Sequence, residues 1–224
     1  MIKVLTWFRR RPDLARDAFL SHWREHHPEV VLALPGLRRY IQNPTTESGY
    51  RKGEPFCDGV AETWWDDLDA LRAQRGTEAM AAVAADEDRF IDPASRGHLV
   101  TREAVILDGT PGPTPSKQFS WIRPRPDLTI EEAQRYWRDE HGPLAARIPG
   151  VVRYVQCHAL PELYGRGRDP SHMGIPIVWL TDLEAARAAA ASPELAATRA
   201  DEVNFLASEH LPFVVSDEIE IPLG

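Results

Sequence analysis

Residues 7–42 read WFRRRPDLARDAFLSHWREHHPEVVLALPGLRRYIQ, and residues 121–156 read WIRPRPDLTIEEAQRYWRDEHGPLAARIPGVVRYVQ. Aligned without a gap at a spacing of 114 residues, the two stretches share 14 of 36 residues. Ordinary composition gives only about two such matches by chance. After one inserted residue the match resumes at a spacing of 115, where Gly59 falls on Gly174 and Trp64 on Trp179. A period this long is too large for a solenoid, so the sequence indicates a duplicated domain.

The boundary between the two copies is marked by composition. Residues 108–116 read DGTPGPTPS, which are all turn or linker residues. We therefore predict a first repeat in residues 1–107, a linker in residues 108–116 and a second repeat in residues 117–224. Each copy then has about the commonest size of a single domain.

Each copy shows the same order of predicted elements: strand, helix, strand, strand, helix, strand. The strands are expected at residues 3–8, 37–42, 60–65 and 99–107, and again at 118–122, 151–157, 175–180 and 213–221. This order is typical of ferredoxin-like domains, in which helices cover one face of the sheet. The other face needs a cover as well, and the simplest is the second sheet. We predict an α+β fold of two ferredoxin-like βαββαβ repeats, packed sheet to sheet as an intrachain pseudo-dimer that closes a barrel.

The overall composition and charge limit the classes of molecule that the protein is expected to bind. The formal net charge is −8 and the pI is about 5.5, which argues against nucleic acid and anionic membranes because both need clustered Lys and Arg. No apolar run is long enough for a membrane span or a signal peptide. Cys57 and Cys157 are not equivalent in the repeat, so we expect free thiols in a reducing cytoplasm.

One long loop follows the second strand of each copy, at residues 43–58 in the first and at residues 158–173 in the second. Both are rich in Gly, Pro, Tyr and Arg. Loops of this length inside a compact domain are often functional.

His27 and His141 are the histidines that recur at equivalent positions. Each lies four residues after a recurring tryptophan, Trp23 or Trp137, and this spacing puts both side chains on one face of a helix. Pro28 follows the first histidine directly and Gly142-Pro143 follows the second, so we expect a kink or a helix end there. A histidine at such a place can face a cavity as an acid–base group, or it can be structural.

Tyr40 and Gln42 lie two residues apart on a predicted strand, as do Tyr154 and Gln156, so each pair shares one face. If that face lines the barrel, the two polar groups orient a ligand. The alternative is a core tyrosine whose hydroxyl binds a protein group. We predict that His141, Tyr154, His27 and Tyr40 are catalytic and that Gln156, Gln42, Trp137 and Trp23 bind the substrate.

Other recurring residues are expected to be structural. The pairs Trp7/Trp121 and Trp64/Trp179 are predicted to be core, and Asp86 and Asp201 to be solvated or helix-capping carboxylates. No group of residues has strong zinc spacing, and there is no Walker loop, GxGxxG or GxSxG motif. We therefore expect neither a metal nor a cofactor.

The second copy resembles the EthD-domain family of the dimeric α+β barrel superfamily, through WRDEHGPL at residues 137–144 and IPGVVRYV at residues 148–155. The first copy is similar through residues 23–28, 34–40 and 86–92, although Pro28-Glu29 replaces Gly142-Pro143. This resemblance implies the same barrel, formed by paired domains that are fused here. Relatives include small cofactor-free lyases, decarboxylases, isomerases and cyclases acting on aromatic or polyketide-like molecules, and haem-dependent or oxygen-using monooxygenases. The family often carries an oxidoreductase label.

Three functions follow as hypotheses. The first is a cofactor-independent enzyme that holds a small aromatic or polyketide-like molecule in the barrel, with His141 as general acid or base and Tyr154 as hydrogen-bond donor to a developing oxyanion. The second is a binding protein that holds such a molecule unchanged. The third is an oxidoreductase or monooxygenase. A further homodimer is left open.

Overall fold

The computed structural model describes residues 1–163, 170–207 and 211–223. The chain forms two compact units, one made of residues 1–100 and 218–224 and the other of residues 101–217. Residues 164–169 of the second predicted loop lie outside the described residues.

The first unit contains most of the first repeat. Its elements are β1 (Ile2–Phe8), α1 (Arg16–Glu25), α2 (His27–Leu32), β2 (Leu37–Pro44), β3 (Gly59–Trp65), α3 (Leu68–Arg72), α4 (Glu78–Glu87), the first four residues of β4 (Gly97–Asp108) and, from the end of the chain, β9 (Ile219–Ile221). The order of strands in its sheet is β4-β1-β3-β2-β9.

The second unit has the same plan. Its elements are the rest of β4, then β5 (Ser116–Ser120), α5 (Ile130–Tyr136), a π-helical turn (Trp137–His141), α6 (Gly142–Ala145), β6 (Val151–Ala159), β7 (Gly174–Leu180), α7 (Leu183–Ala189), α8 (Pro193–Asp201) and β8 (Phe213–Ser216). The order of strands in its sheet is β8-β5-β7-β6-β4.

The compact units differ from the sequence repeats because the last strand of each repeat continues into the other unit. Residues 101–108 of β4 pair with β6, and β9 pairs with β2. Both pairings are antiparallel and extend a four-stranded core of ferredoxin-like order by one strand. The ion pairs Arg39–Glu220 and Arg153–Asp108 join each added strand to its neighbour. The α+β class and the two ferredoxin-like repeats are confirmed; their packing sheet to sheet stays a prediction.

Local sequence explains where the elements begin and end. Thr129 forms a capping box with Glu132 at the start of α5, as its spacing predicts. Gly36 and Gly150 have φ of 79° and 82°, a conformation that glycine adopts without strain, so each Pro-Gly pair stops the helical segment before the next strand. The predicted kink is present in both repeats, as the break at His26 and as the π-helical turn that ends at His141.

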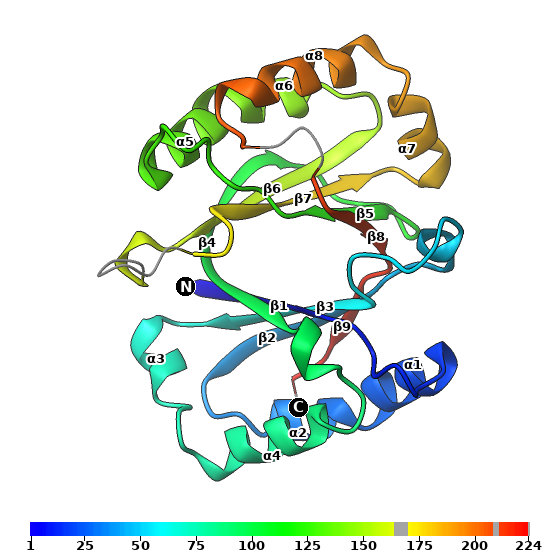
Figure 1. Ribbon diagram of the computed structural model, residues 1–224, viewed down its shortest axis with the longest axis vertical. Helices are drawn as coiled ribbons and strands as arrows, with labels where there is room; N and C mark the ends of the chain where they lie inside the picture. The colour runs from blue at the N-terminus through cyan, green and yellow to red at the C-terminus, as the bar shows by residue number, and fades with distance from the viewer. Residues whose placement is uncertain (164–169, 208–210, 224) are drawn as a thin grey trace. The chain divides into compact units, whose positions relative to one another are not determined.

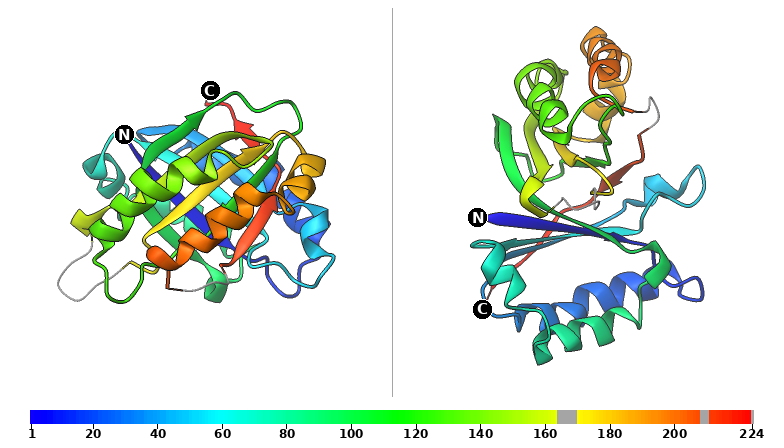
Figure 2. Two further views of the ribbon diagram at one scale, coloured as in Figure 1. Left: turned by 90° about the horizontal axis from the view of Figure 1, so that it is seen from above. Right: turned by 60° about the vertical axis from the view of Figure 1, so that its left-hand side comes forward.

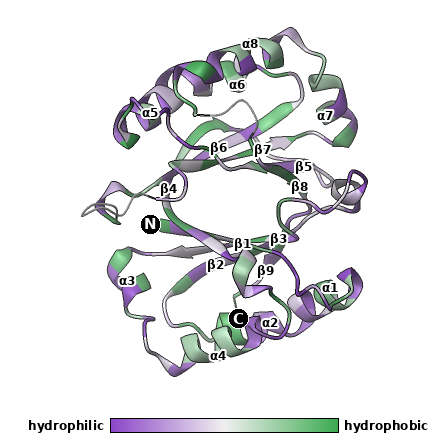
Figure 3. Cartoon of the chain, in the orientation of Figure 1, coloured by the Kyte–Doolittle hydropathy of each residue, from purple (hydrophilic) through white to green (hydrophobic). Residues whose placement is uncertain are grey.

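Helices cover one face of each sheet. In the first unit α1, α2 and α4 lie on the same face of β1, β3 and β2, and in the second unit α5, α6 and α8 lie on the same face of β6 and β7 (Figures 1 and 2). The helices carry both hydrophilic and hydrophobic residues (Figure 3), as expected for helices with one buried face. Aromatic side chains fill the helix–sheet layer, which includes Phe8, Phe19, Trp23 and Phe90 in the first unit.

The recurring glycine and tryptophan are explained by a close approach in this layer. A Cβ added at Gly59 would lie 2.4 Å from Cζ3 of Trp23, and one added at Gly174 would lie 2.4 Å from Cζ3 of Trp137. Each indole therefore packs against bare strand backbone. The predicted core positions of Trp7, Trp121, Trp64 and Trp179 are confirmed, since all four are buried.

Removing residues 218–224 should loosen the first unit, because β2 loses its neighbour β9 and Arg39 loses Glu220. We expect the amides among residues 40–42 that face β9, rather than those that face β3, to exchange with solvent at least about tenfold faster. Hydrogen exchange by NMR measures this. The amides of β6 are the control, because β4 still covers that strand; equal protection in β2 with and without the tail would contradict the pairing.

Candidate functional site

The two recurring histidines each bind a recurring carboxylate. His27, the first residue of α2, lies 2.8 Å through Nδ1 from Oδ2 of Asp86 on α4. His141, the last residue of the π-helical turn, lies 2.9 Å through Nδ1 from Oδ2 of Asp201 at the end of α8. The prediction that both aspartates are solvated or capping is therefore wrong. Their recurrence together with the histidines was the sequence signal that they act as partners.

Both histidines are buried, with 5% of His27 and 7% of His141 exposed. Phe90 and Phe205 lie against them, with ring centroids 4.9 and 4.7 Å away. Burial lowers the pKa of each histidine, and the neighbouring carboxylate opposes that effect without reversing it. Partial burial acts to raise the pKa of Asp86 and Asp201, but hydrogen bonds keep it below its ordinary value. The main ones come from His27 for Asp86 and from Tyr136, followed by His141, for Asp201.

The two carboxylates differ in their remaining partners. Asp86 also contacts His22, at 3.0 Å, and Arg89, at 3.5 Å. Equivalent positions in the second repeat hold Tyr136 and Asn204, and both donate to Asp201 at 2.8 Å. The first cluster thus has basic partners, whereas in the second the partners other than the histidine are neutral.

This geometry suits a histidine acid–base group. An ionised carboxylate accepts a hydrogen bond, so Asp201 favours the His141 tautomer that carries its proton on Nδ1. In the neutral ring Nε2 is then left as a proton acceptor. Within the described part of the chain, Nε2 of His141 has no hydrogen-bond partner. The arrangement can therefore take up and return a proton at one atom.

Tyr154 and Gln156 share a face, as predicted, and that face packs against the helices. Indole Nε1 of Trp137 donates to the Tyr154 hydroxyl at 2.9 Å, and Nε2 of Gln156 donates to the same hydroxyl at 3.1 Å and to the Trp137 carbonyl at 2.8 Å. Burial raises the pKa of Tyr154. Protein groups already occupy this network, so it has a structural role, while catalytic and substrate-binding roles stay predictions.

The first repeat has the same network. Trp23 Nε1 donates to the Tyr40 hydroxyl at 3.3 Å, and Nε2 of Gln42 donates to that hydroxyl at 3.0 Å and to the Trp23 carbonyl at 2.6 Å. The recurrence of these three residues is thus explained by packing between helix and strand. Neither tyrosine has a recorded contact with the histidine of its repeat, so the structure does not join the predicted catalytic residues into one group.

Sequence analysis missed a polar group on the other face of the first sheet. Lys3 forms an ion pair with Glu62, and Asn43 donates to Glu62 at 2.9 Å. All three are fully buried. The lysine recurs as Lys117, at the same spacing of 114 residues, and each lysine lies over a recurring tryptophan, at 4.5 and 4.8 Å from the ring centroid. That recurrence was the available signal.

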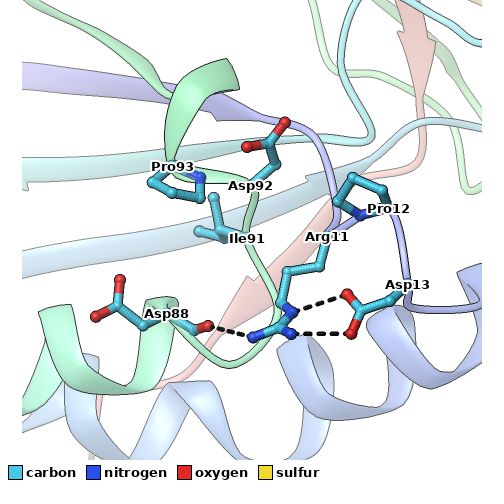
Figure 4. Close-up of a pocket in the computed structure, with 7 residues that line it drawn as sticks. All are labelled: Arg11, Pro12, Asp13, Asp88, Ile91, Asp92 and Pro93. Atoms are coloured by element: carbon cyan, nitrogen blue, oxygen red, sulfur yellow. Dashed lines mark hydrogen bonds and ion pairs between the residues drawn. The ribbon is translucent and has the colours of Figure 1, made fainter.

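A surface hollow of about 370 Å³ in the first unit is lined by the turn after β1 and the segment after α4 (Figure 4). Arg11 binds Asp13 through two hydrogen bonds of 2.9 Å and donates to the Asp88 carbonyl. Arg125 makes the same set of bonds, with Asp127 and the Val203 carbonyl. The recurring Arg-Pro-Asp motif therefore clamps the turn after the first strand in both repeats, which is a structural role.

A second hollow, of about 350 Å³, lies in the second unit. Its lining includes Tyr136 and Asn204, the two residues that donate to Asp201. This hollow therefore borders the hydrogen-bond network that ends at His141. The remaining lining residues are Leu128, Glu132, Arg135, Asp139 and Glu140.

Among the residues that the structure describes, no group of three or more His, Cys, Asp or Glu side chains is arranged to hold a metal ion. Within the same residues, no helix has both the length and the apolar character needed to span a membrane.

A family model described as EthD domain matches residues 11–94 and residues 125–209, one match in each repeat. No match was found among curated proteins.

The similar solved structures include some that cover nearly the whole chain. An anthrone oxidase-like protein has 14% identity and a TM-score of 0.66, with 98% of this chain and 92% of that one covered. A protein from Lactobacillus acidophilus NCFM, assigned as a monooxygenase, has 10% identity and a TM-score of 0.59 over 100% and 96%. An EthD family protein from Bacillus halodurans C-125 has 22% identity and a TM-score of 0.40 over 46% and 99%. At these identities the first two likenesses show the fold.

Acid should destabilise the protein through the two histidines. Because their folded pKa lies below the unfolded value near 6.5, the unfolded chain binds more protons as the pH falls through 6.5, so stability rises with pH in that window. Each histidine contributes at most about 1.4 kcal/mol per pH unit. Urea unfolding of wild type and His141→Gln between pH 7 and 5 measures this. The variant should show the smaller slope, and identical slopes would contradict the assignment.

Tyr154→Phe should lower the free energy of unfolding by about 1–3 kcal/mol, because the variant leaves two buried donors, from Trp137 and Gln156, without their acceptor. Tyr40→Phe is the matched variant in the first repeat and should lose a similar amount. Urea titration followed by tryptophan fluorescence measures both. A fully stable Tyr154→Phe would show that the hydroxyl does not hold the helix to the sheet.

Proposed function

This chain belongs to the EthD domain family, and we propose that it is an enzyme that moves a proton on a small molecule, with His141 as the acid–base group and Asp201 as the carboxylate that orients it. The observation that carries this proposal is the His–Asp pair, which occurs in both repeats with Nδ1 to Oδ2 distances of 2.8 and 2.9 Å. A positioned histidine of this kind typically speeds a proton transfer by ~10²- to 10⁴-fold.

The second repeat is the better candidate for catalysis. In the first repeat Asp86 has three basic neighbours, and His22 competes with His27 for the carboxylate. In the second repeat the carboxylate is held by Tyr136 and Asn204, which line a hollow. A carboxylate fixed by neutral donors keeps its charge for the one histidine that it orients.

The reaction class proposed is lyase, decarboxylase, cyclase or isomerase, acting on an aromatic or polyketide-like molecule. These reactions share a proton transfer next to a carbonyl or phenol, which a single histidine can perform. The proposal includes no cofactor and no metal. Cys57 and Cys157 are buried and are not joined in a disulfide, which supports a reducing compartment, and we propose the cytoplasm.

A second candidate is a protein that binds a small molecule without changing it. One observation favours it: the hydroxyls of Tyr40 and Tyr154 already accept two hydrogen bonds each from the protein. Both tyrosines are also buried in the helix–sheet layer, where the hydroxyl serves packing rather than a ligand. The two candidates differ in what replacing His141 does to turnover.

His141→Gln should lower turnover by about one to three orders of magnitude, whereas His27→Gln, the matched variant, should change it less than about threefold. The assay uses a substrate found by screening small aromatic and polyketide-like carbonyl compounds. Binding of that compound by both variants, measured by calorimetry, should be retained. Equal losses in the two variants would contradict the assignment to the second repeat, and full turnover in both would favour a different acid–base group.

The pH dependence tests the role of Asp201. Burial keeps the pKa of His141 below 6.5, so kcat/KM should rise with pH and level off with a midpoint below 6.5 if neutral His141 is the base. Asp201→Asn removes the charge that raises this pKa, so the midpoint should move to still lower pH while the plateau falls. An unchanged midpoint in Asp201→Asn would exclude His141 as the titrating base.

A further inference from the structure

The helix that carries His141 contains a turn that the first repeat lacks. Between α5 and α6, residues 137–141 form a π-helical turn, closed by the Gly142 N–H on the Trp137 carbonyl. Such turns insert one residue into a helix and are frequent at functional sites. In the first repeat α1 ends at Glu25, and His27 instead begins a new helix.

A side chain from the sheet holds the carbonyl at the start of this turn. Nε2 of Gln156 donates to the Trp137 carbonyl at 2.8 Å, so this oxygen accepts two N–H groups, one from Gln156 and one from Gly142. Gln156 is completely buried. The orientation of the Gln156 amide therefore determines whether its N–H reaches the Trp137 carbonyl, at the start of the turn that ends at His141.

His158 fixes that orientation. Its Nε2 lies 2.9 Å from Oε1 of Gln156, and its ring lies on the Trp137 indole with centroids 4.6 Å apart. Burial lowers the pKa of His158 to about 4, so at neutral pH the ring carries one proton. The amide oxygen is an acceptor, and the bond therefore requires that proton on Nε2.

The first repeat shows what happens without this donor. The equivalent of His158 is Pro44, which has no side-chain N–H. Among the described residues, Oε1 of Gln42 is buried and has no hydrogen-bond partner. The two glutamine networks otherwise make the same bonds, so the repeats differ by one donor, two residues after the glutamine on the strand.

We infer that His158 and Gln156 are positioning residues for His141, holding the π-helical turn in the form that directs His141 toward Asp201. This inference rests on the proposed function of His141. The inference also explains a difference between the repeats. Only the second repeat has the His158–Gln156 hydrogen bond, and its histidine, His141, is the one that we assign to catalysis. The first repeat, which has Pro44 in place of His158, keeps the His27–Asp86 pair but has, within the described residues, no donor to the glutamine oxygen.

NMR on the intact protein tests the inference without any substrate. Nitrogen-15 spectra at pH 7 should show His158 protonated on Nε2 and His141 protonated on Nδ1. In His158→Leu the Gly142 amide should exchange about tenfold faster, because Gln156 loses the bond that fixes it. The pKa of His141 should move up toward 6.5 as water reaches the loosened turn. His27 is the internal control and should not change.

His158→Gln is the rescue variant, since its amide nitrogen can replace Nε2 as donor to Gln156. It should restore wild-type exchange at Gly142 and the wild-type pKa of His141. Unchanged values in a folded His158→Leu would overturn the inference. If that variant does not fold, a wild-type His158 found protonated on Nδ1, or a His158→Gln that fails to retain wild-type values, would overturn it. Because these readouts need no turnover, their failure is distinct from failure of the proposed function.

Discussion

The contact of an indole with a strand glycine is the constraint on which each repeat depends. Trp23 on Gly59 and Trp137 on Gly174 bring the first helical segment so close to the sheet that a single Cβ would collide with the ring. At this distance the indole N–H reaches the strand tyrosine, and the strand glutamine reaches the helix carbonyl. Packing and hydrogen bonding therefore specify the same helix position.

That position determines where the histidine lies. The residue four places after each tryptophan points away from the sheet layer toward the second helical segment, where an aspartate receives it. Burial disfavours a charged imidazole, and the carboxylate offsets only part of that cost. The result is a neutral histidine with a fixed tautomer. Such a histidine can serve as a structural link between the two helical segments or as an acid–base group. The residues around each histidine must therefore distinguish a structural role from an acid–base role.

The duplication allows the surroundings of the two histidines to be compared within one chain. The Trp–Tyr–Gln network and the Arg-Pro-Asp motif are the same in both repeats, so they report on the fold. One set of differences lies at the carboxylate that binds each histidine: His22 and Arg89 contact Asp86, whereas Tyr136 and Asn204 donate to Asp201. A second set of differences lies at the strand position of Pro44 and His158.

Sequence alone determined the duplication, the α+β class and the order of strands and helices, because these follow from residue spacing and local turn chemistry. It also identified His27 and His141, through their recurrence. It placed Tyr40, Gln42 and their counterparts on one strand face, but alternation along a strand does not say which face the helices cover.

Only the tertiary structure decided which residues meet. Asp86 is 59 residues from His27, and Asp201 is 60 residues from His141, so no local pattern joins them. The pairing of β9 with β2 and of β4 with β6 likewise joins segments that are distant in the sequence. Spacing determines secondary structure because neighbours along the chain share one backbone geometry. Contacts between distant segments depend on how whole elements pack, and that information is spread over many residues at once.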